Sequence, residues 1–354
     1  MNNKPFYNYL KKLMGSKIKI NNKSRLNQME DTTIHGKSGE TPYGKYLVFL
    51  EFQEQYEISF DKIFGKGAFG CVYGGTNKRT GQKVAIKVVE YTPNSLVEVR
   101  IGSHVGSSPY TCGIIAYSLY YGKLYIVMDL IDGDNLYNII RSNQGYFWEN
   151  PLELMKIILM ILKAVQFLHS KAVVHRDIKL ENILAKYDEN GELCRCVIVD
   201  LGLANEANKM KRSVVGTPDY LAPEALAKNF DRFSFGLDIW AIGVLFHELL
   251  FEKTLVPEYN GHDDLFTKIK IVIGKPIEPP KSIDDADPKI QFIWNVILAC
   301  LVNDPERRSS LEYLICEVER YLLSIQCDVE AALEVDEVPA LPESDFDYNI
   351  FNRN

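Results

Sequence analysis

Three glycines near the start of the chain have a spacing that could bring backbone close to phosphate. The segment reads G-K-G-A-F-G-C-V and runs through Gly65, Lys66, Gly67, Ala68, Phe69, Gly70, Cys71 and Val72. Without side chains at the glycines, backbone N–H groups can approach phosphate oxygens closely. A dinucleotide-binding loop shares this spacing but opens a helix, whereas β-type runs flank this segment. A glycine-rich hairpin without any ligand would read the same way.

A lysine on the next apolar run is the second residue that could do chemistry. The run V-A-I-K ends at Lys87, where an ammonium group could reach the α and β phosphates of a nucleotide. Such a lysine needs an anionic partner when no nucleotide is bound. Glu98, on the following predicted helix, is the best-placed acid. Glu90 is nearer in sequence but lies at the end of the strand, so we favour Glu98.

Two further strings place acids beside apolar runs. Asp177, Lys179 and Asn182 lie in the first string, V-H-R-D-I-K-L-E-N-I-L. Asp200 lies in the second, V-I-V-D-L-G. Each acid by itself would be interpreted as a solvated loop carboxylate. Their order after the glycine-rich segment and Lys87 favours a common site instead.

At this point the chain resembles the eukaryotic protein kinase family, whose catalytic loop reads H-R-D-x-K-x-x-N. By that resemblance Asp177 accepts the proton of a substrate hydroxyl, Lys179 steadies the transferring phosphate, and Asn182 and Asp200 hold magnesium. The reaction spreads charge over phosphoryl oxygens, so positioning and nearby cations lower its barrier. Leu201 departs from the usual D-F-G, and its apolar side chain can occupy the same packing position.

The resemblance also implies ATP and Mg²⁺ as cofactors and a set of residues around the nucleotide. That set is Phe64, Gly65, Lys66, Gly67, Ala68, Phe69, Gly70, Cys71, Val72, Ala85, Lys87, Glu98 and Met128. The string G-T-P-D-Y-L-A-P-E, which ends at Glu224, resembles the end of the family's activation segment, a platform for protein substrates. Glu224 is expected to pair with Arg308, and Asp238 to anchor the backbone of the catalytic loop.

Lys179 and Thr217 resemble the serine/threonine branch of the family. The expected activity is therefore transfer of the ATP γ-phosphoryl group to serine or threonine hydroxyls of a protein substrate. Glu181 and Asp134 lie at positions where some members of this family bind basic residues of their protein substrates. Two solvated carboxylates would look the same in the sequence.

Ser213 is the predicted control site. Arg176, next to Asp177, carries a charge that a phosphate on the activation segment could neutralise, which would order that loop. Ser213 lies four residues before Thr217 and is the expected site of this phosphate. An active enzyme with unmodified Ser213 would refute any requirement for it.

The elements that must position these residues follow from hydrophobic periodicity. From about residue 56, β-type runs joined by turns predict a sheet of five strands, and one helix is predicted at 94–105. Further helices are predicted at 152–170, 237–252, 290–301 and 310–325. The expected fold is α+β and two-lobed, like that of a protein kinase, with a small antiparallel β-sheet lobe and a larger, mainly α lobe.

The predicted domain boundaries follow changes in net charge and in the pattern of apolar residues along the chain. Residues 1–55 are expected to form a basic, disordered extension, 56–326 the kinase domain with its lobes meeting at about 131–132, and 327–354 an acidic tail. Residues 1–29 contain seven Lys or Arg and no acid, whereas residues 328–347 contain no Lys or Arg. Like-charged polar runs bury too little surface to offset chain entropy.

Composition excludes several classes of protein. The seven cysteines are an odd number without a C-x-x-C pair, which favours a reducing, intracellular setting in the cytoplasm or nucleus. The N-terminus lacks the apolar run of a secretory signal. Lys156 and Lys163 interrupt the most apolar stretch, so no membrane span is expected. The basic segment lacks an aromatic-basic pattern, which disfavours nucleic acid as a partner. The oligomeric state is left open.

Two rival functions remain at this stage. A scaffold with the same fold could bind nucleotide without transferring phosphate, because a fold does not determine an activity. The presence of Lys87, Asp177, Asn182 and Asp200 disfavours it. A small-molecule phosphotransferase of related architecture would share these acids. The string that ends at Glu224 disfavours this second rival, since it resembles a platform for proteins.

Overall fold

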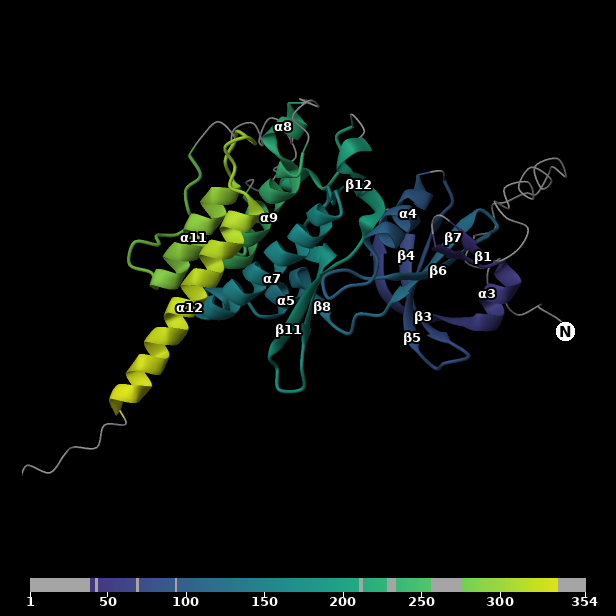
Figure 1. Cartoon of the computed structure of the whole chain (residues 1–354), viewed down its shortest axis with the longest axis horizontal. Coiled ribbons are helices and arrows are strands. Elements are labelled where there is room, and N and C mark those ends of the chain that lie inside the picture. The colour runs from purple at the N-terminus through teal and green to yellow at the C-terminus, as the bar shows by residue number, and fades with distance from the viewer. Residues whose placement is uncertain are drawn as a thin grey trace, which may run out of the picture. The chain divides into compact units, whose positions relative to one another are not determined.

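The computed structural model describes residues 39–41, 44–67, 70–92, 94–209, 213–227, 234–255 and 276–336. These residues belong to two units (Figure 1). Unit 1 comprises the chain up to Asp132 together with Val199–Glu206, and unit 2 comprises Gly133–Ile198 and the chain from Ala207 onwards. Unit 1 is built on a β-sheet and unit 2 is mostly helical, so the expected two-lobed α+β fold is confirmed.

Unit 1 contains a seven-stranded sheet in the order β1-β2-β6-β7-β5-β4-β3. Neighbouring strands are antiparallel except for β2 and β6, which are parallel. The strands are β1 (Gly39–Thr41), β2 (Gly44–Tyr46), β3 (Tyr56–Gly67), β4 (Gly70–Asn77), β5 (Lys83–Glu90), β6 (Ile114–Tyr120) and β7 (Lys123–Asp129). Unit 1 also contains the helices α3 (Phe49–Gln55) and α4 (Ser95–Val105) and the short strand β12 (Asn205–Glu206).

Helix α4 forms where residues 94–105 predicted a helix. Its first turn is closed by a reciprocal pair of hydrogen bonds, in which the backbone N–H of Thr92 donates to Ser95 Oγ and that of Ser95 to Thr92 Oγ1. The helix ends at Val105 because Gly106 follows with φ 76, a left-handed conformation that favours glycine. The buried face of α4 includes Glu98 and Gly102.

The predicted disordered extension over residues 1–55 is wrong for its described part. Residues 39–41, 44–46 and 49–55 form β1, β2 and α3, which adds two strands and one helix to the predicted lobe. Phe49 and Phe52 of α3 are buried on the sheet, and the Phe49 ring stacks on Tyr120 with centroids 3.8 Å apart. The helix is too short for its periodicity to be recognised, yet it covers an apolar face of the sheet. Residues 1–38 lie outside the described residues.

Unit 2 combines a small sheet with a helical body. Its sheet has the order β11-β10-β8, with β8 (Asp134–Asn135), β10 (Ile183–Tyr187) and β11 (Leu193–Ile198), and β9 (Val173–Val174) also belongs to this unit. The helices are α5 (Leu136–Ser142), α6 (Tyr146–Glu149), α7 (Pro151–Ser170), α8 (Pro223–Leu226), α9 (Gly236–Phe251), α11 (Pro288–Cys300) and α12 (Leu311–Asp336). The four predicted helices correspond to α7, α9, α11 and α12.

Helix α9 is the centre of unit 2, and nearly all of its residues are buried. It packs against α7 and α11, and at Gly243 a Cβ would lie 2.7 Å from Cys300 Cβ. A larger residue there would push α11 away. Helix α12 continues to Asp336, beyond the predicted end at residue 325 and the predicted tail boundary at 327. Residues 337–354 lie outside the described part of the chain.

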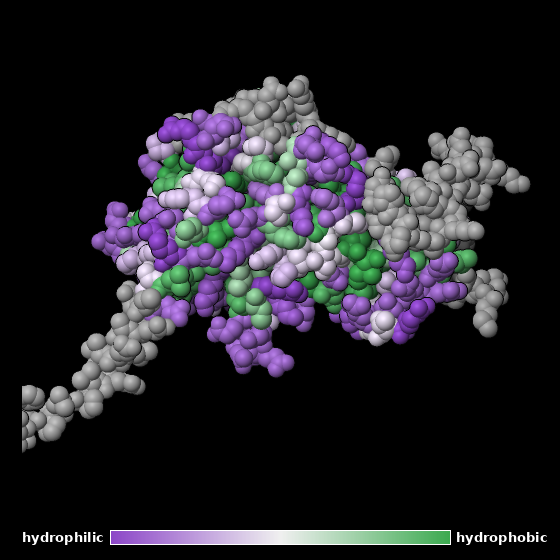
Figure 2. All heavy atoms as spheres, viewed as in Figure 1, coloured by the Kyte–Doolittle hydropathy of each residue, from purple (hydrophilic) through white to green (hydrophobic). Residues whose placement is uncertain are grey.

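Two surface features of unit 2 follow from its sequence. The turn between β10 and β11 carries Asp188 and Glu192, and it forms the hydrophilic projection at the bottom of Figure 2.

Of the helices in the described residues, none is both long and apolar enough to cross a membrane. In α7, Lys163 forms an ion pair with Glu319 of α12 at 2.7 Å.

Candidate active site

Lys87 is the centre of a charged cluster in unit 1. Its Nζ lies 2.7 and 2.8 Å from the two carboxylate oxygens of Glu98 and 2.7 Å from Oδ1 of Asp200. The predicted choice of Glu98 over Glu90 is confirmed, because Glu90 forms an ion pair with Lys123 at the surface. The contact between Lys87 and Asp200 was not predicted.

Burial makes this cluster electrostatically strong. Lys87 and Glu98 are 5 and 6% exposed, and charges in such places interact far more strongly than in water. Burial by itself would lower the pKa of Lys87, but Glu98 and Asp200 outweigh it and raise that pKa, so the ammonium stays charged. Burial also raises the pKa of Glu98 from its usual value, and Lys87 opposes this shift.

The register of the sheet places four predicted nucleotide-binding residues on one face. Val72 is opposite Lys87 in the β4–β5 pair, and Ala85 is opposite Met128 in the β5–β7 pair. Lys87 and Ala85 are two positions apart on β5 and therefore share a face. Cys71 is opposite Val88, on the other face. Because side chains alternate along a strand, the Cys71 side chain points away from the face that carries Lys87, and only its backbone lies beside the predicted nucleotide site.

The glycine-rich segment lies where β3 turns into β4. Gly70 has φ 143, and a Cβ there would lie 2.3 Å from the backbone oxygen of Val88, so the position requires glycine. At Gly65 and Gly67 a Cβ would meet nothing within 4 Å, which leaves open space beside the backbone. Phe64 and Lys66 are exposed. Ala68 and Phe69 are outside the described residues.

Asp200 adopts a left-handed conformation with φ 63, which is uncommon for a residue with a side chain. Its Oδ1 accepts a hydrogen bond from the backbone N–H of Gly202 at 3.2 Å, at the start of the 3-10 turn Leu201–Leu203. Leu201 is buried. A Cβ on Gly102 of α4 would be 3.9 Å from Leu201 Cδ1, so the apolar residue after Asp200 does pack beside the helix.

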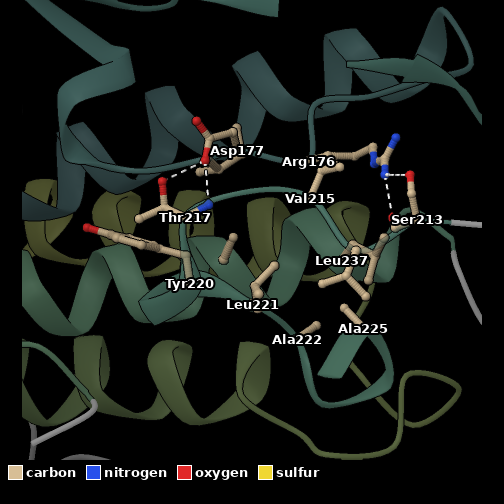
Figure 3. A pocket seen from close by; sticks show the side chains of 13 residues that line it. Arg176, Asp177, Ser213, Val215, Thr217, Tyr220, Leu221, Ala222, Ala225 and Leu237 are labelled. Carbon is tan, nitrogen blue, oxygen red and sulfur yellow. Dashed lines mark hydrogen bonds between the residues drawn. The ribbon is translucent and has the colours of Figure 1, made fainter. Parts of the chain in front are cut away.

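In unit 2, the carboxylate of Asp177 is held by Thr217, Asn182 and Lys179, and Figure 3 shows its two bonds to Thr217. Its Oδ1 accepts hydrogen bonds from both the backbone N–H and the hydroxyl of Thr217, each at 2.8 Å. Asn182 Nδ2 donates to the Asp177 backbone oxygen at 2.9 Å and to its Oδ2 at 3.2 Å. Lys179 Nζ lies 3.4 Å from Oδ2 of Asp177 and donates to the Thr217 hydroxyl at 2.9 Å. The role of Thr217 as a partner of Asp177 was not predicted from the sequence.

Asp238 anchors the loop that carries Asp177, as predicted. It is fully buried and accepts hydrogen bonds from the backbone N–H groups of His175 at 2.8 Å and Arg176 at 2.9 Å. His169 Nε2 lies 2.9 Å from the same carboxylate. Burial alone would raise the pKa of Asp238, but the hydrogen bonds and the nearby histidines lower it below its usual value. The anchor therefore remains an anion.

The predicted pair of Glu224 and Arg308 is also confirmed. Arg308 Nη1 lies 2.9 Å from Glu224 Oε1 and its Nη2 lies 3.2 Å from Oε2, with both side chains almost fully buried. The guanidinium also donates from Nε to the Val302 backbone oxygen at 3.0 Å. This bidentate pair holds the start of α8 against the loop before α12.

Arg176 links the loop of Asp177 to the predicted control site. It has φ 69, and burial lowers the pKa of its guanidinium from the usual value while Asp238 opposes this shift. Its Nη2 points to Ser213, as Figure 3 shows. Arg176, Asp177, Ser213 and Thr217 line a small cavity of about 20 Å³.

Comparison with known proteins identifies the family. The model of the protein kinase domain matches residues 58–318. The chain belongs to the protein kinase family. The match covers both units, and every motif of the site lies within it. Residues 39–57, which the structure includes in unit 1, precede the matched part of the kinase domain.

Relatives of this kinase domain include several serine/threonine kinases. It is 33% identical over 293 residues to calcium-dependent protein kinase 5 of Plasmodium falciparum, covering 80% of this chain and 45% of the relative. It is 34% identical to serine/threonine-protein kinase dkf-2 of Caenorhabditis briggsae, covering 58% of this chain and 18% of the relative. It is 31% identical to serine/threonine-protein kinase CG17528 of Drosophila melanogaster, covering 73 and 34%. The chain thus spans less than half the length of these relatives.

Besides the contact between Lys87 and Asp200, three sets of contacts in the kinase domain were not predicted from sequence. They are the bonds from Thr217 to Asp177, the bond from Tyr220 to Glu248, and the ion pair of Arg100 with Glu206. Thr217 was noted only as a mark of the serine/threonine branch. Only the ion pair of Arg100 had a signal in the sequence. Arg100 is a charged residue on a predicted helix without an evident partner nearby in the chain.

Proposed function

We propose that this kinase domain transfers the γ-phosphoryl group of ATP to serine or threonine hydroxyls of protein substrates. The observation that carries the proposal is the geometry of Asp177. Asp177 is 7% exposed, and its carboxylate is fixed by Thr217 and Asn182 and has Lys179 beside it. A carboxylate held in this way can orient a hydroxyl and accept its proton, while the adjacent lysine offsets developing negative charge.

Lys87 has the matching role in unit 1. Its ammonium would contact the α and β phosphates of ATP, next to the open space at Gly65 and Gly67. Glu98 and Asp200 hold it in place and keep it charged in the absence of nucleotide. Val72, Ala85 and Met128 share its face of the sheet and would provide apolar contacts for the adenine ring.

Mg²⁺ bound with ATP would neutralise charge on the phosphate oxygens. The residues fit this ion, because Mg²⁺ is usually bound by one or two protein oxygens, several waters and the substrate phosphates. In unit 1 the proposed ligand is Asp200, whose side chain is 31% exposed and so reachable. In unit 2 it is Asn182, whose amide nitrogen bonds to Asp177 and thereby fixes the orientation of the amide oxygen.

Acids on unit 2 favour basic residues in the substrate. Tyr220 donates a hydrogen bond to Glu248, and burial raises the pKa of Glu248, which Glu181 and Asp219 raise further. A nearby cation would relieve this repulsion. We therefore propose that a substrate arginine or lysine binds beside Glu181 and Glu248. In a panel of peptides with and without arginine near the acceptor, Glu181→Gln should reduce the preference for arginine by roughly tenfold.

An intracellular setting is part of the proposal. It is supported by six free cysteines among the described residues, of which Cys194 and Cys316 are exposed. Exposed thiols persist where the surroundings are reducing.

The deciding experiment is transfer of labelled γ-phosphate from Mg-ATP to generic protein acceptors, followed by hydrolysis to find the labelled amino acid. We expect label on serine or threonine with the wild-type chain. Asp177→Asn should lower turnover by about 10²-fold or more, as the loss of a positioned base usually does. The matched control is Asp188→Asn, which removes an exposed carboxylate in the β10–β11 turn and should leave turnover unchanged.

The same experiment separates the rival functions. Unchanged turnover in Asp177→Asn would refute the assignment of the base. If neither form transfers phosphate while ATP still raises the melting temperature, the chain is a nucleotide-binding scaffold. Transfer to a small metabolite but to no protein would indicate a small-molecule phosphotransferase.

A further inference from the structure

An ion pair in unit 1 joins α4 to the segment that follows Asp200. Arg100 of α4 pairs with Glu206 of β12, and their side chains are 28 and 19% exposed. The two residues are 106 positions apart in the chain. Charges that are largely shielded from water interact more strongly than an exposed surface pair does. This contact therefore differs from the exposed pair of Lys123 and Glu90 in the same unit.

Helix geometry relates Arg100 to Glu98. An α-helix turns by about 100° per residue, so residues two positions apart point about 200° away from each other. Glu98 points to Lys87, and Arg100 points to the opposite side of the helix, where Glu206 receives it. A rotation of α4 that withdraws Glu98 from Lys87 would therefore also move Arg100 relative to Glu206.

Close packing restricts the helix on the side of Glu98. Gly102 is one helical turn further on, and a Cβ there would lie 2.4 Å from Ile114 Cδ1 of β6. The helix therefore touches the sheet at Gly102 without room to shift inward. The ion pair at Arg100 restrains the helix on its other side.

The segment from Asp200 to Glu206 is held at both ends by these contacts. Lys87 binds Asp200 at its start, and Arg100 binds Glu206 at its end. Between them lies the turn that contains Leu201 and packs beside Gly102. Sheet, helix and segment thus form a closed chain of contacts through Lys87, Glu98, Arg100, Glu206 and Asp200.

We propose that Arg100 is a positioning residue, which acts through Glu206 to keep α4 in the orientation where Glu98 holds Lys87. The proposal rests on the proposed function, since its effect is measured on phosphoryl transfer. Arg100 does not touch the reacting atoms. It sets the fraction of molecules in which Lys87 is correctly placed for ATP.

Charge reversal and its rescue test the proposal. Arg100→Glu, or Glu206→Arg, should lower kcat/KM for ATP by roughly tenfold, in line with coupling between partly buried charges. The double variant with both changes restores opposite charges and should recover to within about threefold of wild type. Lys123→Glu is the matched control in the exposed pair and should change kcat/KM by less than about twofold.

A second measurement separates positioning from simple stabilisation. In a Glu98→Ala background, Arg100→Glu should produce no further loss, because Arg100 acts through Glu98. Additive losses in that background, or failure of the double reversal to recover activity, would overturn the proposal. Melting temperatures of all variants show whether unfolding causes a loss. An inactive wild-type chain would count against the proposed function, whereas an active wild type with fully active Arg100→Glu counts only against this inference.

Discussion

Arg176 Nη2 donates a hydrogen bond to the backbone oxygen of Ser213 at 2.8 Å and lies 3.4 Å from its hydroxyl. The guanidinium of the loop that carries Asp177 is thus already directed at the residue predicted from sequence to control the enzyme. A phosphate on this hydroxyl would form charge-assisted hydrogen bonds with Arg176 and fix the segment that leads to Thr217.

Phosphorylation of Ser213 is therefore expected to increase turnover by about tenfold or more, because it orders the segment that holds Asp177. The measurement compares activity with the phosphate content of Ser213 by mass spectrometry, before and after phosphatase treatment. Ser213→Ala should be insensitive to phosphatase, and Ser170→Ala, at an exposed helix end, is the control. Full activity with unmodified Ser213 would show that the phosphate is not required.

Replacing Lys87 by methionine should abolish most phosphoryl transfer and leave the fold intact. The change removes the cation that binds both Glu98 and Asp200. Turnover is expected to fall about 10²-fold or more, because the phosphates lose their main protein cation. Persistent transfer would contradict the proposed contact between Lys87 and ATP.

The same variant should show an altered pH dependence of stability. Burial raises the pKa of Glu98, and without Lys87 nothing in the ion pair opposes that shift. A carboxyl whose pKa is raised in the folded state binds its proton more tightly there, so its contribution to stability is lost as the pH rises through that pKa. The free energy of unfolding of Lys87→Met relative to wild type should thus fall as the pH increases from about 4 towards neutrality. A difference independent of pH would contradict a buried, unpaired Glu98.

Arg308→Met should destabilise the protein strongly. It leaves Glu224 buried without its cation, and breaking a buried pair in this way usually costs about 3–5 kcal/mol. Lys163→Met removes one partner of the exposed pair with Glu319 and should cost about 0–1 kcal/mol. Urea denaturation of the three proteins measures both values. Equal, small losses would mean that the Glu224 pair contributes no more than a surface contact.

His247 is expected to make the protein sensitive to acid. Burial lowers the pKa of His247 from 6.5 to about 4, and its Nδ1 lies 3.0 Å from the backbone oxygen of Lys253. The unfolded chain takes up the proton at higher pH than the folded one. The stabilisation is therefore complete above pH 6.5 and is lost as the pH falls towards about 4.

His247→Gln retains a polar group for Lys253 but cannot titrate. Its free energy of unfolding should change less between pH 6.5 and 4 than that of the wild type, by an amount on the order of 3 kcal/mol. Unfolding measured across this range checks the prediction, with His104→Gln at an exposed position as the control. Parallel pH profiles for His247→Gln and the wild type would refute it.

Local patterns allowed most of the fold to be predicted. The helices α4, α7, α9 and α11 were recognised because each repeats apolar residues at helical spacing over several turns. The helix α3 was missed because its seven residues contain too few repeats. The strands β1 and β2 are only three residues long, which is too short for an alternating pattern of apolar residues to be recognised.

The features of the site likewise divide into those that the sequence predicted and those that required the structure. Lys87, Asp177, Asn182 and Asp200 were identified because their motifs have distinctive spacing along the chain. The face to which each side chain points, such as Val72 towards Lys87 and Cys71 away from it, came only from the strand register.

The sequence by itself determined the family, the proposed reaction and the identity of its main residues, because these depend on residue types at fixed short spacings. The tertiary structure alone decided that Thr217 holds Asp177, that α3 covers the sheet and that Arg100 meets Glu206. Arg100 and Glu206 are brought together by the packing of α4 against the sheet and the turn at Leu201. Such contacts depend on burial and geometry between distant segments, which no local pattern of residues contains.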